Sequence, residues 1–342
     1  MKAVTLGEIM LRLSPSNYQK LNKCDSFDAV YGGAEANVAV ALSNWGIPTS
    51  YVTRLPDNIL GKAAQAALVE HQVNTEHVIL GGKRLGIYFI DKGKATRTRN
   101  VIYDREGSAF TGIKPSMIDW DNILQNAQCL HWSGITPAIS YSAAKTCDLA
   151  IKTANRLGIF VSADLNYRPQ LWKYGKNPKE VLYPLLKRSN LIIADPLGSQ
   201  QALEIELDGV DLDSKNLNQR QSRAFAEKLH QTFPKAQFIA FTLRNVISAT
   251  HQRIKAYFFD GIQLYKTNVI DIDPVVDRIG SGDAFAAGLI YGLLKLDHNN
   301  YQEILNFAMA SCFYKHTLPG DFNTVEVEKI KSLASKIKKT KP

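Results

Sequence analysis

Short apolar runs alternate with helix-length amphipathic stretches through most of this chain of 342 residues. Near-continuous apolar runs are typical of parallel strands that are buried on both faces, and the stretches between them have helical periodicity. The predicted strands are Ser50–Arg54, Cys129–Trp132, Phe160–Asp164, Leu191–Ala194 and Phe238–Leu243. The predicted helices between them are Leu60–His71, Ser142–Leu157, Pro178–Lys187 and Arg220–His230. This order predicts a doubly wound α/β sheet, mostly parallel, with helices on both faces.

Two parts of the chain break this alternation and predict a second, smaller sheet. Its candidate pieces are Val4–Leu13, the polar stretch that leads from there to Tyr31, and the strands Gly86–Ile90 and Thr96–Tyr103 around a turn at 91–94. We expect them to form a small antiparallel β lid from segments at about 10–33 and 84–112. Because no repeat or low-complexity linker divides the sequence, we predict a single domain over 1–342.

The positive charge of the chain is concentrated at its C-terminal end. Lysines and arginines number 41 against 32 aspartates and glutamates, a formal charge of +9. Six lysines and no acid lie in 329–342, and subtracting them leaves +3 for the first 328 residues. We interpret this end as a solvated basic tail and expect no nucleic-acid partner, because no aromatic residues are interleaved with the lysines.

The cysteines and the apolar runs indicate a cytoplasmic protein with no membrane partner. The four cysteines, at positions 24, 129, 147 and 312, lack the spacing of a zinc site or redox pair, so we expect reduced thiols. The first residues lack the pattern of a signal peptide. The longest apolar run, Ala284–Leu294, is shorter than the roughly 20 residues that cross a membrane.

A polar, glycine-rich turn runs directly into a long apolar helix at Asp277–Gly288, with the sequence DRIGSGDAFAAG. Gly280 and Gly282 allow backbone angles that let consecutive N–H groups point at one spot. That spot is also the positive end of the following helix and therefore favours an anion. We predict an anion hole at Gly280, Ser281 and Gly282, with Asp283 beside it in the first helical turn.

An anion hole beside a carboxylate is suited to phosphoryl transfer. The amides would neutralise charge on the migrating group, while Asp283 would accept the proton of an attacking hydroxyl. The alternative is an ordinary helix N-terminus with an acidic residue in its first turn. The chain has no G-x-x-x-x-G-K-[ST] sequence, so it is not expected to be a P-loop enzyme.

Two segments resemble the signatures of the PfkB, or ribokinase-like, family of sugar kinases. Asp277–Gly288 resembles the C-terminal signature, and Gly32–Gly46 (GGAEANVAVALSNWG) resembles the N-terminal one. Taken alone, the second segment could be a packing turn and an Ala-rich helix. The resemblance implies a ribokinase-like fold, and it implies that Gly33 lets a sugar approach the backbone while Asn37 binds its hydroxyls.

Within that family, nearly the whole chain resembles the 2-keto-3-deoxygluconate kinases. The matching segments are Gly7–Met10, Gly32–Gly46, Tyr103–Ala109, His131–Pro137, Asp164–Arg168, Leu171–Trp172 and Gly320–Asp321. The resemblance implies ATP-dependent phosphorylation of this sugar acid at its C6 hydroxyl, with Asp283 as the base. It also implies Mg²⁺, a monovalent cation as a further candidate cofactor, and a homo-oligomer, dimeric or larger.

A sugar acid carries a carboxylate, so its site should contain fixed positive charge. Arg105 follows a predicted lid strand and Arg168 follows a predicted core strand, where the loops of an open α/β sheet meet ligands. A guanidinium can hold a carboxylate with two bonds, although either arginine could instead form a surface ion pair. Tyr88 and Tyr103 would add hydroxyl donors and an apolar wall. Asp321 resembles a family position near the substrate.

Two loops on the nucleotide side depart from the family pattern. After the strand Leu191–Ala194 the chain reads Asp195-Pro-Leu-Gly, without the Glu that many relatives have there, and we therefore assign no metal ligand. The usual Thr-x-Gly-x-x-Gly reads Thr242-Leu-Arg244-Asn-Val-Ile-Ser, with both glycines replaced. Arg244 could contact the ATP phosphates or point into solvent. The resemblance implies that Asn166, Thr242, Arg244, Gly280 and Gly282 bind the nucleotide.

Two other functions fit parts of this pattern. A fructokinase or ribokinase would share Asp283 but would not need Arg105 and Arg168. A non-catalytic sugar or nucleotide sensor would explain the two altered loops on the nucleotide side.

Overall fold

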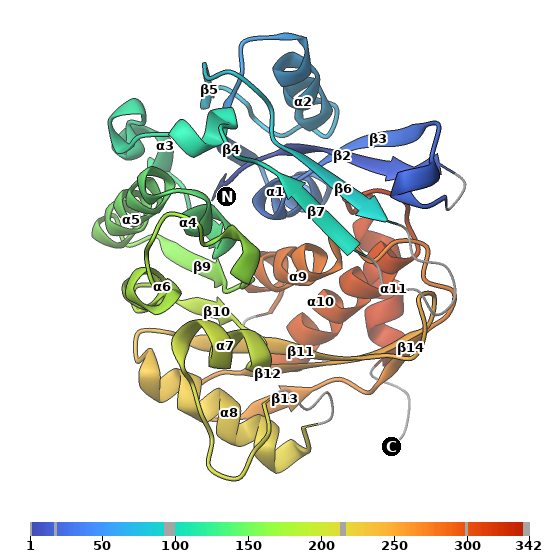
Figure 1. Ribbon diagram of the computed structural model, residues 1–342. Helices are drawn as coiled ribbons and strands as arrows, with labels where there is room; N and C mark the ends of the chain where they lie inside the picture. Colours follow the sequence, from blue (N-terminus) through green and yellow to red (C-terminus); the bar gives the residue numbers. More distant parts are fainter. Residues whose placement is uncertain (1, 17–18, 92–99, 213–216, 298–299, 338–342) are drawn as a thin grey trace.

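The computed structural model describes residues 2–16, 19–91, 100–212, 217–297 and 300–337. A ten-stranded sheet forms its centre, in the order β13-β12-β11-β10-β9-β8-β1-β4-β5, with β14 beside β12, and helices cover both faces (Figure 1). Neighbouring strands are parallel along β5, β4, β1, β8, β9, β10 and β11. Strand β12 pairs antiparallel with β11, β13 and β14. The predicted doubly wound, mostly parallel α/β sheet is confirmed.

The elements have the following bounds. The strands of the main sheet are β1 (Ala3–Leu6), β4 (Thr49–Leu55), β5 (Val78–Leu80), β8 (Cys129–Ser133), β9 (Phe160–Asp164), β10 (Leu191–Ile193), β11 (Phe238–Val246), β12 (Gln252–Phe259), β13 (Leu264–Lys266) and β14 (Ile270–Ile272). The helices are α1 (Ala34–Asn44), α2 (Ile59–Val69), α3 (Trp120–Leu124), α4 (Ile135–Ile139), α5 (Tyr141–Arg156), α6 (Pro178–Leu186), α7 (Pro196–Leu203), α8 (Gln219–Thr232), α9 (Ser281–Lys295), α10 (Tyr301–His316) and α11 (Val327–Ile337). Short 3₁₀ turns are η2 (Leu21–Lys23), η3 (Ala109–Gly112), η4 (Pro115–Met117) and η5 (Pro169–Leu171).

A separate four-stranded sheet has the order β3-β2-β6-β7, with bounds β2 (Met10–Pro15), β3 (Phe27–Gly32), β6 (Ile87–Asp91) and β7 (Asn100–Asp104). Its two outer pairs, β2–β3 and β6–β7, are antiparallel as predicted, and they join through a parallel pairing of β2 with β6. The predicted turn at 91–94 and the start of the strand predicted at 96–103 lie largely outside the described residues.

One sequence prediction about the first strand is wrong. The segment Val4–Leu13 was expected to belong wholly to the small sheet, but β1 lies inside the main sheet between β4 and β8. All four residues of β1 are buried, because the main sheet and its helices enclose them on both sides. The chain crosses from one sheet to the other at 7–9. The antiparallel strands β12 to β14 were also not predicted.

The helices divide between the two faces of the main sheet. One buried cluster joins the sheet to α3, α5, α6, α7 and α8, and a second joins it to α1, α9, α10 and α11 (Figure 1). In the second cluster the Trp45 ring packs edge-on against Tyr291 of α9 and Phe307 of α10. Gly288 lets α9 approach α10, because a Cβ there would lie 2.5 Å from the Ala308 Cα. This packing brings the N-terminal ends of α1 and α9 to one end of the sheet.

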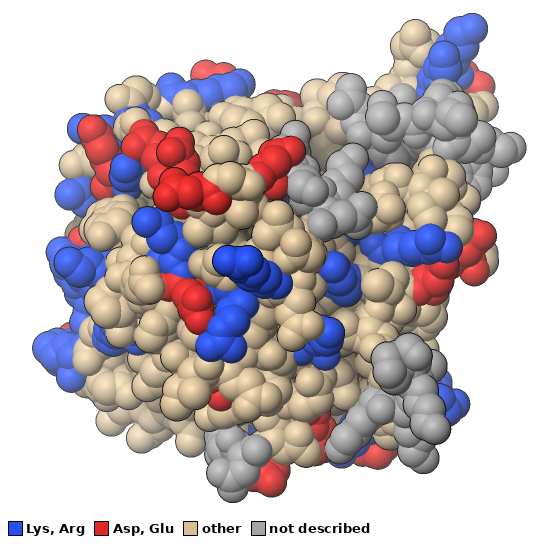
Figure 2. Space-filling model, turned by 90° about the horizontal axis from the view of Figure 1, so that it is seen from below, with Lys and Arg blue, Asp and Glu red and all other residues tan. Residues whose placement is uncertain are grey.

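The end of the chain is partly helical. Residues 329–337 of the predicted basic tail belong to α11, where Ile330 and Ala334 are buried in the core while Lys329, Lys331 and Lys336 are exposed. Residues 338–342 lie outside the described part. On the face shown in Figure 2, acidic side chains stand among the basic ones. Within the described ranges, no helix has the length and apolar character that crossing a membrane needs.

Candidate active site

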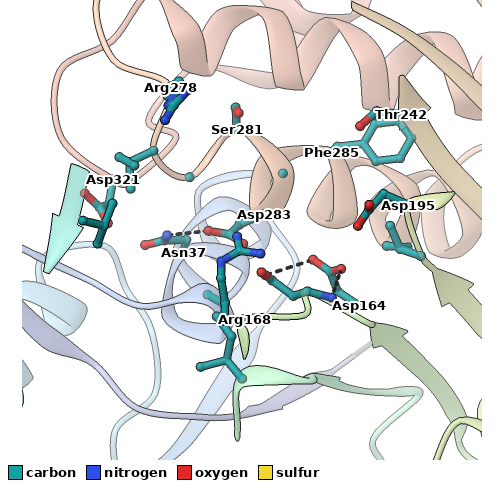
Figure 3. A pocket seen from close by; sticks show the side chains of 18 of the residues that line it. Asn37, Asp164, Arg168, Asp195, Thr242, Arg278, Ser281, Asp283, Phe285 and Asp321 are labelled. Atoms are coloured by element: carbon teal, nitrogen blue, oxygen red, sulfur yellow. Dashed lines mark hydrogen bonds between the residues drawn. The ribbon is translucent and has the colours of Figure 1, made fainter. Parts of the chain in front are cut away.

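A pocket of about 650 Å³ lies where the carboxyl ends of β9, β10 and β11 meet the N-terminal ends of α1 and α9. Residues of the small sheet form another of its walls, and this end of a parallel sheet is where α/β proteins bind ligands. Every site residue that the sequence predicts lines this one pocket, namely Gly33, Asn37, Tyr88, Tyr103, Arg105, Asn166, Arg168, Thr242, Arg244, Gly280, Ser281, Gly282, Asp283 and Asp321. Figure 3 shows several of these side chains from close by.

Asp283 lies in the first turn of α9 and is 8% exposed. Its Oδ2 accepts a hydrogen bond of 2.6 Å from the Asn37 side-chain amide, which comes from the first turn of α1 (Figure 3). Burial raises the pKa of Asp283 to about 7, and the nearby carboxyl groups of Asp164 and Asp321 also raise it, while the bond from Asn37 lowers it. A carboxyl that titrates near neutral pH can accept a proton from an alcohol.

The turn before α9 has the backbone that the glycine pattern predicts. Gly280 has φ +80°, and a Cβ there would stand 2.1 Å from the carbonyl oxygen of Asp321. Gly282 faces open space. The Ser281 amide donates to the Arg278 carbonyl oxygen at 3.2 Å and thereby closes the turn. A bound anion would therefore meet the amides of Gly280 and Gly282 and the hydroxyl of Ser281 at the positive end of α9.

Arg105 is buried rather than free in the pocket. Its Nε and Nη2 both lie 2.7 Å from Glu8 Oε2, while its guanidinium stands 5.7 Å from the centre of the Tyr103 ring. The buried Nη1 of Arg105 has no hydrogen-bond partner among the residues that the structure describes. Glu8 thus orients Arg105 and leaves one donor for a ligand. Sequence reasoning missed this partner, although Glu8 lies in a segment that resembles the family.

Arg168, in contrast, is an exposed side chain that extends into the pocket (Figure 3). Its Nη1 donates to the carbonyl oxygen of Tyr167 at 2.9 Å, and no ion pair holds it within the described part of the chain. This leaves most of its guanidinium donors available. The alternative interpretation of Arg168 as one half of a surface ion pair is therefore not supported.

Tyr88 and Asp321 contact each other in a way that the sequence does not predict. The Tyr88 hydroxyl donates to Asp321 Oδ2, so it is already engaged within the protein. Asp321 Oδ1 accepts a further bond of 2.7 Å from Arg12 on β2. Both residues still present their remaining surface to the pocket, where Tyr88 contributes an apolar ring next to Tyr103.

The nucleotide side of the pocket holds Arg244, whose orientation the sequence left open. Its Nη2 donates to Ser281 Oγ at 3.1 Å, and its buried Nε has no partner among the described residues. Arg244 thus points at the turn formed by Gly280, Ser281 and Gly282, the anion turn, and not into solvent. Burial lowers its pKa, and the nearby Arg168 lowers it further, as expected of two cations in one pocket.

Two carboxyl groups outside the predicted site set, Asp164 and Asp195, follow the adjacent strands β9 and β10. Asp195 caps α7 by accepting from the Gly198 amide at 2.8 Å, and Asp164 accepts from the Asn166 amide at 3.1 Å. Burial raises the pKa of Asp164 to about 7. Asn166 takes a left-handed backbone (φ +36°) to make this turn. The signal that could have pointed to Asp164 is its place at the end of a buried strand.

The pKa of Asp283 predicts an acidic limb in the pH profile. A base acts when it is deprotonated, so kcat/KM for the acceptor should rise about tenfold per pH unit and level off above about pH 7. Initial rates between pH 5 and 9 would measure this limb. A profile without it would contradict the assignment.

The pocket combines an anion turn with a buried carboxyl group in the first turn of α9, at the ligand-binding end of a parallel α/β sheet, and this arrangement is suited to phosphoryl transfer to a small-molecule hydroxyl. The chain belongs to the pfkB family of carbohydrate kinases, whose family model matches residues 1–194. It is therefore an enzyme and a carbohydrate kinase with the ribokinase-like fold. The resemblance to this family that the sequence indicated is confirmed.

Several relatives show how far this similarity extends. A 2-dehydro-3-deoxygalactonokinase from Haloferax volcanii is 30% identical over 330 residues, which span 96% of this chain and 95% of the relative. The crystal structure of a 2-dehydro-3-deoxygluconokinase from Thermotoga maritima has a TM-score of 0.92 at 39% identity, covering 98% of this chain and 99% of that one. A fructokinase from Xylella fastidiosa with bound ATP, at 20% identity and a TM-score of 0.78 over 99% of both chains, shares the fold.

Proposed function

We propose that this kinase transfers the γ-phosphoryl group of ATP to the C6 hydroxyl of 2-keto-3-deoxygluconate, giving 2-keto-3-deoxy-6-phosphogluconate. The observation that carries the proposal is the meeting, in one pocket, of Asp283, the anion turn and the two arginines Arg105 and Arg168. An acceptor that is itself an anion would pair with the donors that these arginines leave open, namely Nη1 of Arg105 and most of the Arg168 guanidinium. The names of the Haloferax volcanii and Thermotoga maritima relatives, which are 30% and 39% identical to this chain, support a 2-keto-3-deoxy sugar acid.

Asp283 is the proposed general base. Its carboxylate takes the proton of the C6 hydroxyl as that oxygen forms a bond to the γ-phosphorus and the bond from phosphorus to the β–γ bridging oxygen breaks. ADP leaves with the electron pair of the broken bond. The Asn37 amide donates to Oδ2 of Asp283 and so helps to fix the orientation of the carboxylate. Because Asp283 itself is buried, the base needs little reorganisation when the proton moves.

The anion turn and Arg244 fit the phosphates of ATP. Gly282 leaves open space in front of the helix end, and the buried Nε of Arg244 is an orphaned donor beside Ser281. We propose that Gly280, Ser281, Gly282 and Arg244 neutralise the charge that develops on the migrating group. Thr242, within β11, and Asn166, just after β9, would line the rest of the nucleotide site.

Magnesium fits the carboxyl groups near this wall. Mg²⁺ is usually held by one or two carboxylates together with substrate phosphates and water, and Asp164 and Asp195 are the two that would hold it here. Within the described residues no cluster of three or more metal-ligating side chains occurs, which agrees with an ion that arrives with the nucleotide. When bound, the ion would neutralise charge on the phosphates.

The carboxylate of the sugar acid is assigned to Arg168 and Arg105. Arg168 offers most of a free guanidinium, and Arg105 offers its unpartnered Nη1. Tyr103 and the Tyr88 ring would cover the apolar 3-deoxy carbon, while Gly33, with only a hydrogen on its Cα, lets the sugar approach the backbone. We also propose that the small sheet acts as the lid over this substrate. We further propose that the enzyme works in the cytoplasm. We also propose that it forms a homo-oligomer, as the family resemblance implies.

Arg168→Lys should raise the KM for 2-keto-3-deoxygluconate about tenfold, because a charge-assisted pair of bonds becomes a single point contact. Steady-state kinetics with the acceptor varied at saturating ATP would measure this change. Arg156→Lys is the matched control, since Arg156 is an exposed arginine that pairs with Asp121 away from the pocket. Equal KM values for wild type and Arg168→Lys would remove Arg168 from the acid site.

A coupled ADP-release screen tests the proposed reaction. The panel should contain 2-keto-3-deoxygluconate, its galactonate epimer, gluconate, fructose and ribose, because the Haloferax volcanii relative is named for the galactonate epimer. We expect the two 2-keto-3-deoxy acids to exceed the neutral sugars in kcat/KM, with the gluconate epimer highest. Faster turnover of fructose or ribose would support the neutral-sugar alternative, and absence of turnover with all acceptors would support the sensor.

A further inference from the structure

Arg12 is the most deeply buried arginine near the site, yet it does not line the pocket. It lies on β2 of the small sheet and is 2% exposed. Its Nη1 contacts Asp321 Oδ1 at 2.7 Å, its Nη2 contacts Asp277 Oδ2 at 2.6 Å, and its Nε donates to Ser14 Oγ at 3.0 Å. Both aspartates come from the C-terminal part of the chain, so this one side chain ties the small sheet to the main domain.

Each of these aspartates has a second contact that leads to a functional part of the site. Asp321 Oδ2 accepts from the hydroxyl of Tyr88, whose ring lines the pocket. Asp277 Oδ1 accepts from the amide of Ile279 at 3.1 Å, one residue before Gly280. Arg12 is therefore the central residue in a series of contacts that begins at Tyr88 in the pocket wall and ends next to the anion turn.

The backbone of Asp321 makes the same connection a second time. Gly280 is so close to the Asp321 carbonyl oxygen that a Cβ would stand 2.1 Å away, and a Cβ on Gly32 would stand 2.2 Å from Asp321 Oδ2. Asp321 is thus packed between β3 of the small sheet and the anion turn. Asp321 therefore cannot move without changing its close packing against Gly32 or Gly280.

The register of the small sheet extends this line toward the acid site. Arg12 is opposite Tyr88 in the parallel pairing of β2 with β6, and Tyr88 is opposite Tyr103 in the pairing of β6 with β7. The rings of the two tyrosines have centroids 6.3 Å apart, and both line the pocket. A ligand that contacts Tyr103 or Tyr88 therefore contacts the row of side chains across β7, β6 and β2 that includes Arg12.

Opposite charges lie close together inside this buried cluster. Two buried cations, Arg12 and Lys315, face two buried carboxylates, Asp277 and Asp321. A guanidinium can hold two carboxylates at fixed angles, whereas an ammonium is a point charge that holds one well. If the Arg12 guanidinium were replaced by an ammonium, one of the two buried carboxylates would be poorly paired, which is costly away from water.

We propose that Arg12 is a positioning residue that couples occupation of the sugar site to the geometry of the anion turn, and this inference rests on the proposed function. Arg12 does not bind the sugar acid, because Asp277 and Asp321 already hold its guanidinium and it lies behind the pocket wall. Sugar binding against Tyr88 and Tyr103 fixes Asp321 and, through Arg12, Asp277 and Gly280. The phosphates then meet an anion turn that is already in place.

The direct test is a measurement of binding coupling in the full chain. The affinity for a non-hydrolysable ATP analogue would be measured by calorimetry with and without saturating 2-keto-3-deoxygluconate. For wild type we expect the sugar acid to tighten analogue binding about fivefold or more. Arg12→Lys should bind each ligand alone nearly as wild type does, lose this gain, and lower kcat roughly tenfold to a hundredfold.

Two further variants make the test decisive. Arg54→Lys is the matched control, because Arg54 is a half-buried arginine that donates to the Gly112 carbonyl oxygen at 2.8 Å outside the pocket, and it should keep both the gain and kcat. Asp277→Asn, which keeps the shape of the side chain but not its charge, replaces Arg12→Lys if the latter fails to fold. It should also reduce the gain and kcat.

Three results would overturn the proposal. They are a wild type without any gain, an Arg12→Lys protein whose melting temperature falls while its gain and kcat remain, and an equal loss of the gain in Arg54→Lys. Failure of the proposed function has a different signature, since wild type would then neither bind nor phosphorylate the sugar acid. In that case the coupling would be measured with the acceptor that the ADP-release screen identifies.

Discussion

Asp283→Asn is expected to lower kcat about a thousandfold while ATP and the sugar acid still bind. The amide has nearly the size of the carboxyl group and can still accept the bond from Asn37, so the pocket should keep its shape. It cannot accept a proton at neutral pH, and general-base catalysis of this kind contributes roughly a hundredfold to ten-thousandfold. Rapid-quench kinetics would report the chemical step, and calorimetry would report binding of each ligand.

The matched control for this variant is Asp121→Asn. Asp121 is an exposed carboxylate in α3 that pairs with Arg156 at the surface, and its loss should leave kcat as in wild type. Near-wild-type turnover in Asp283→Asn would remove Asp283 from the chemistry. If Asp283→Asn lost both sugar-acid binding and turnover, Asp283 would instead be a binding residue.

Gly280→Ala is expected to lower kcat by about a hundredfold to a thousandfold. The left-handed backbone at φ +80° is strained for alanine, and the new Cβ would stand 2.1 Å from the Asp321 carbonyl oxygen. The turn must therefore open, which moves the amides away from the migrating phosphoryl group. Removal of one preorganised donor of this kind costs a factor of this size in other enzymes. Steady-state kcat with saturating substrates is the measurement.

Gly158→Ala separates this local effect from general backbone strain. Gly158 has a similar left-handed backbone, φ +70°, after the end of α5, but nothing stands within 4 Å of the position of a Cβ. It should lose some stability and keep its kcat. If Gly280→Ala lost only stability, as Gly158→Ala should, the anion turn would have no part in catalysis.

The main sheet was predictable from sequence because its central strands are buried on both faces. Such strands read as short apolar runs, so β8, β9 and β10 were located almost to the residue. The first strand was misassigned because β1 and the start of β2 are both rich in apolar residues and only Gly7 to Ile9 separate them. Strand β12 was missed because its first half, Gln252–Lys255, is mostly polar, and β13 and β14 were missed because three residues are too few for a clear pattern.

The site could be predicted where a local pattern carries the chemistry. The glycines and Asp283 lie next to one another in sequence, and Asp283 sits in the first helical turn as expected. The contacts that orient the site join residues far apart in the chain, such as Glu8 with Arg105 and Arg12 with Asp277. No local pattern signals such a pair, because its physical cause is the burial of two charges that only the folded chain brings together.

A crystal structure of the enzyme with 2-keto-3-deoxygluconate and a non-hydrolysable ATP analogue would test the central claim most directly. We predict that the C6 hydroxyl oxygen lies about 3 Å from a carboxylate oxygen of Asp283. The γ-phosphate should face the amides of Gly280 and Gly282. A complex in which Asp283 turns away from the acceptor, or in which another side chain holds the C6 hydroxyl, would contradict the mechanism.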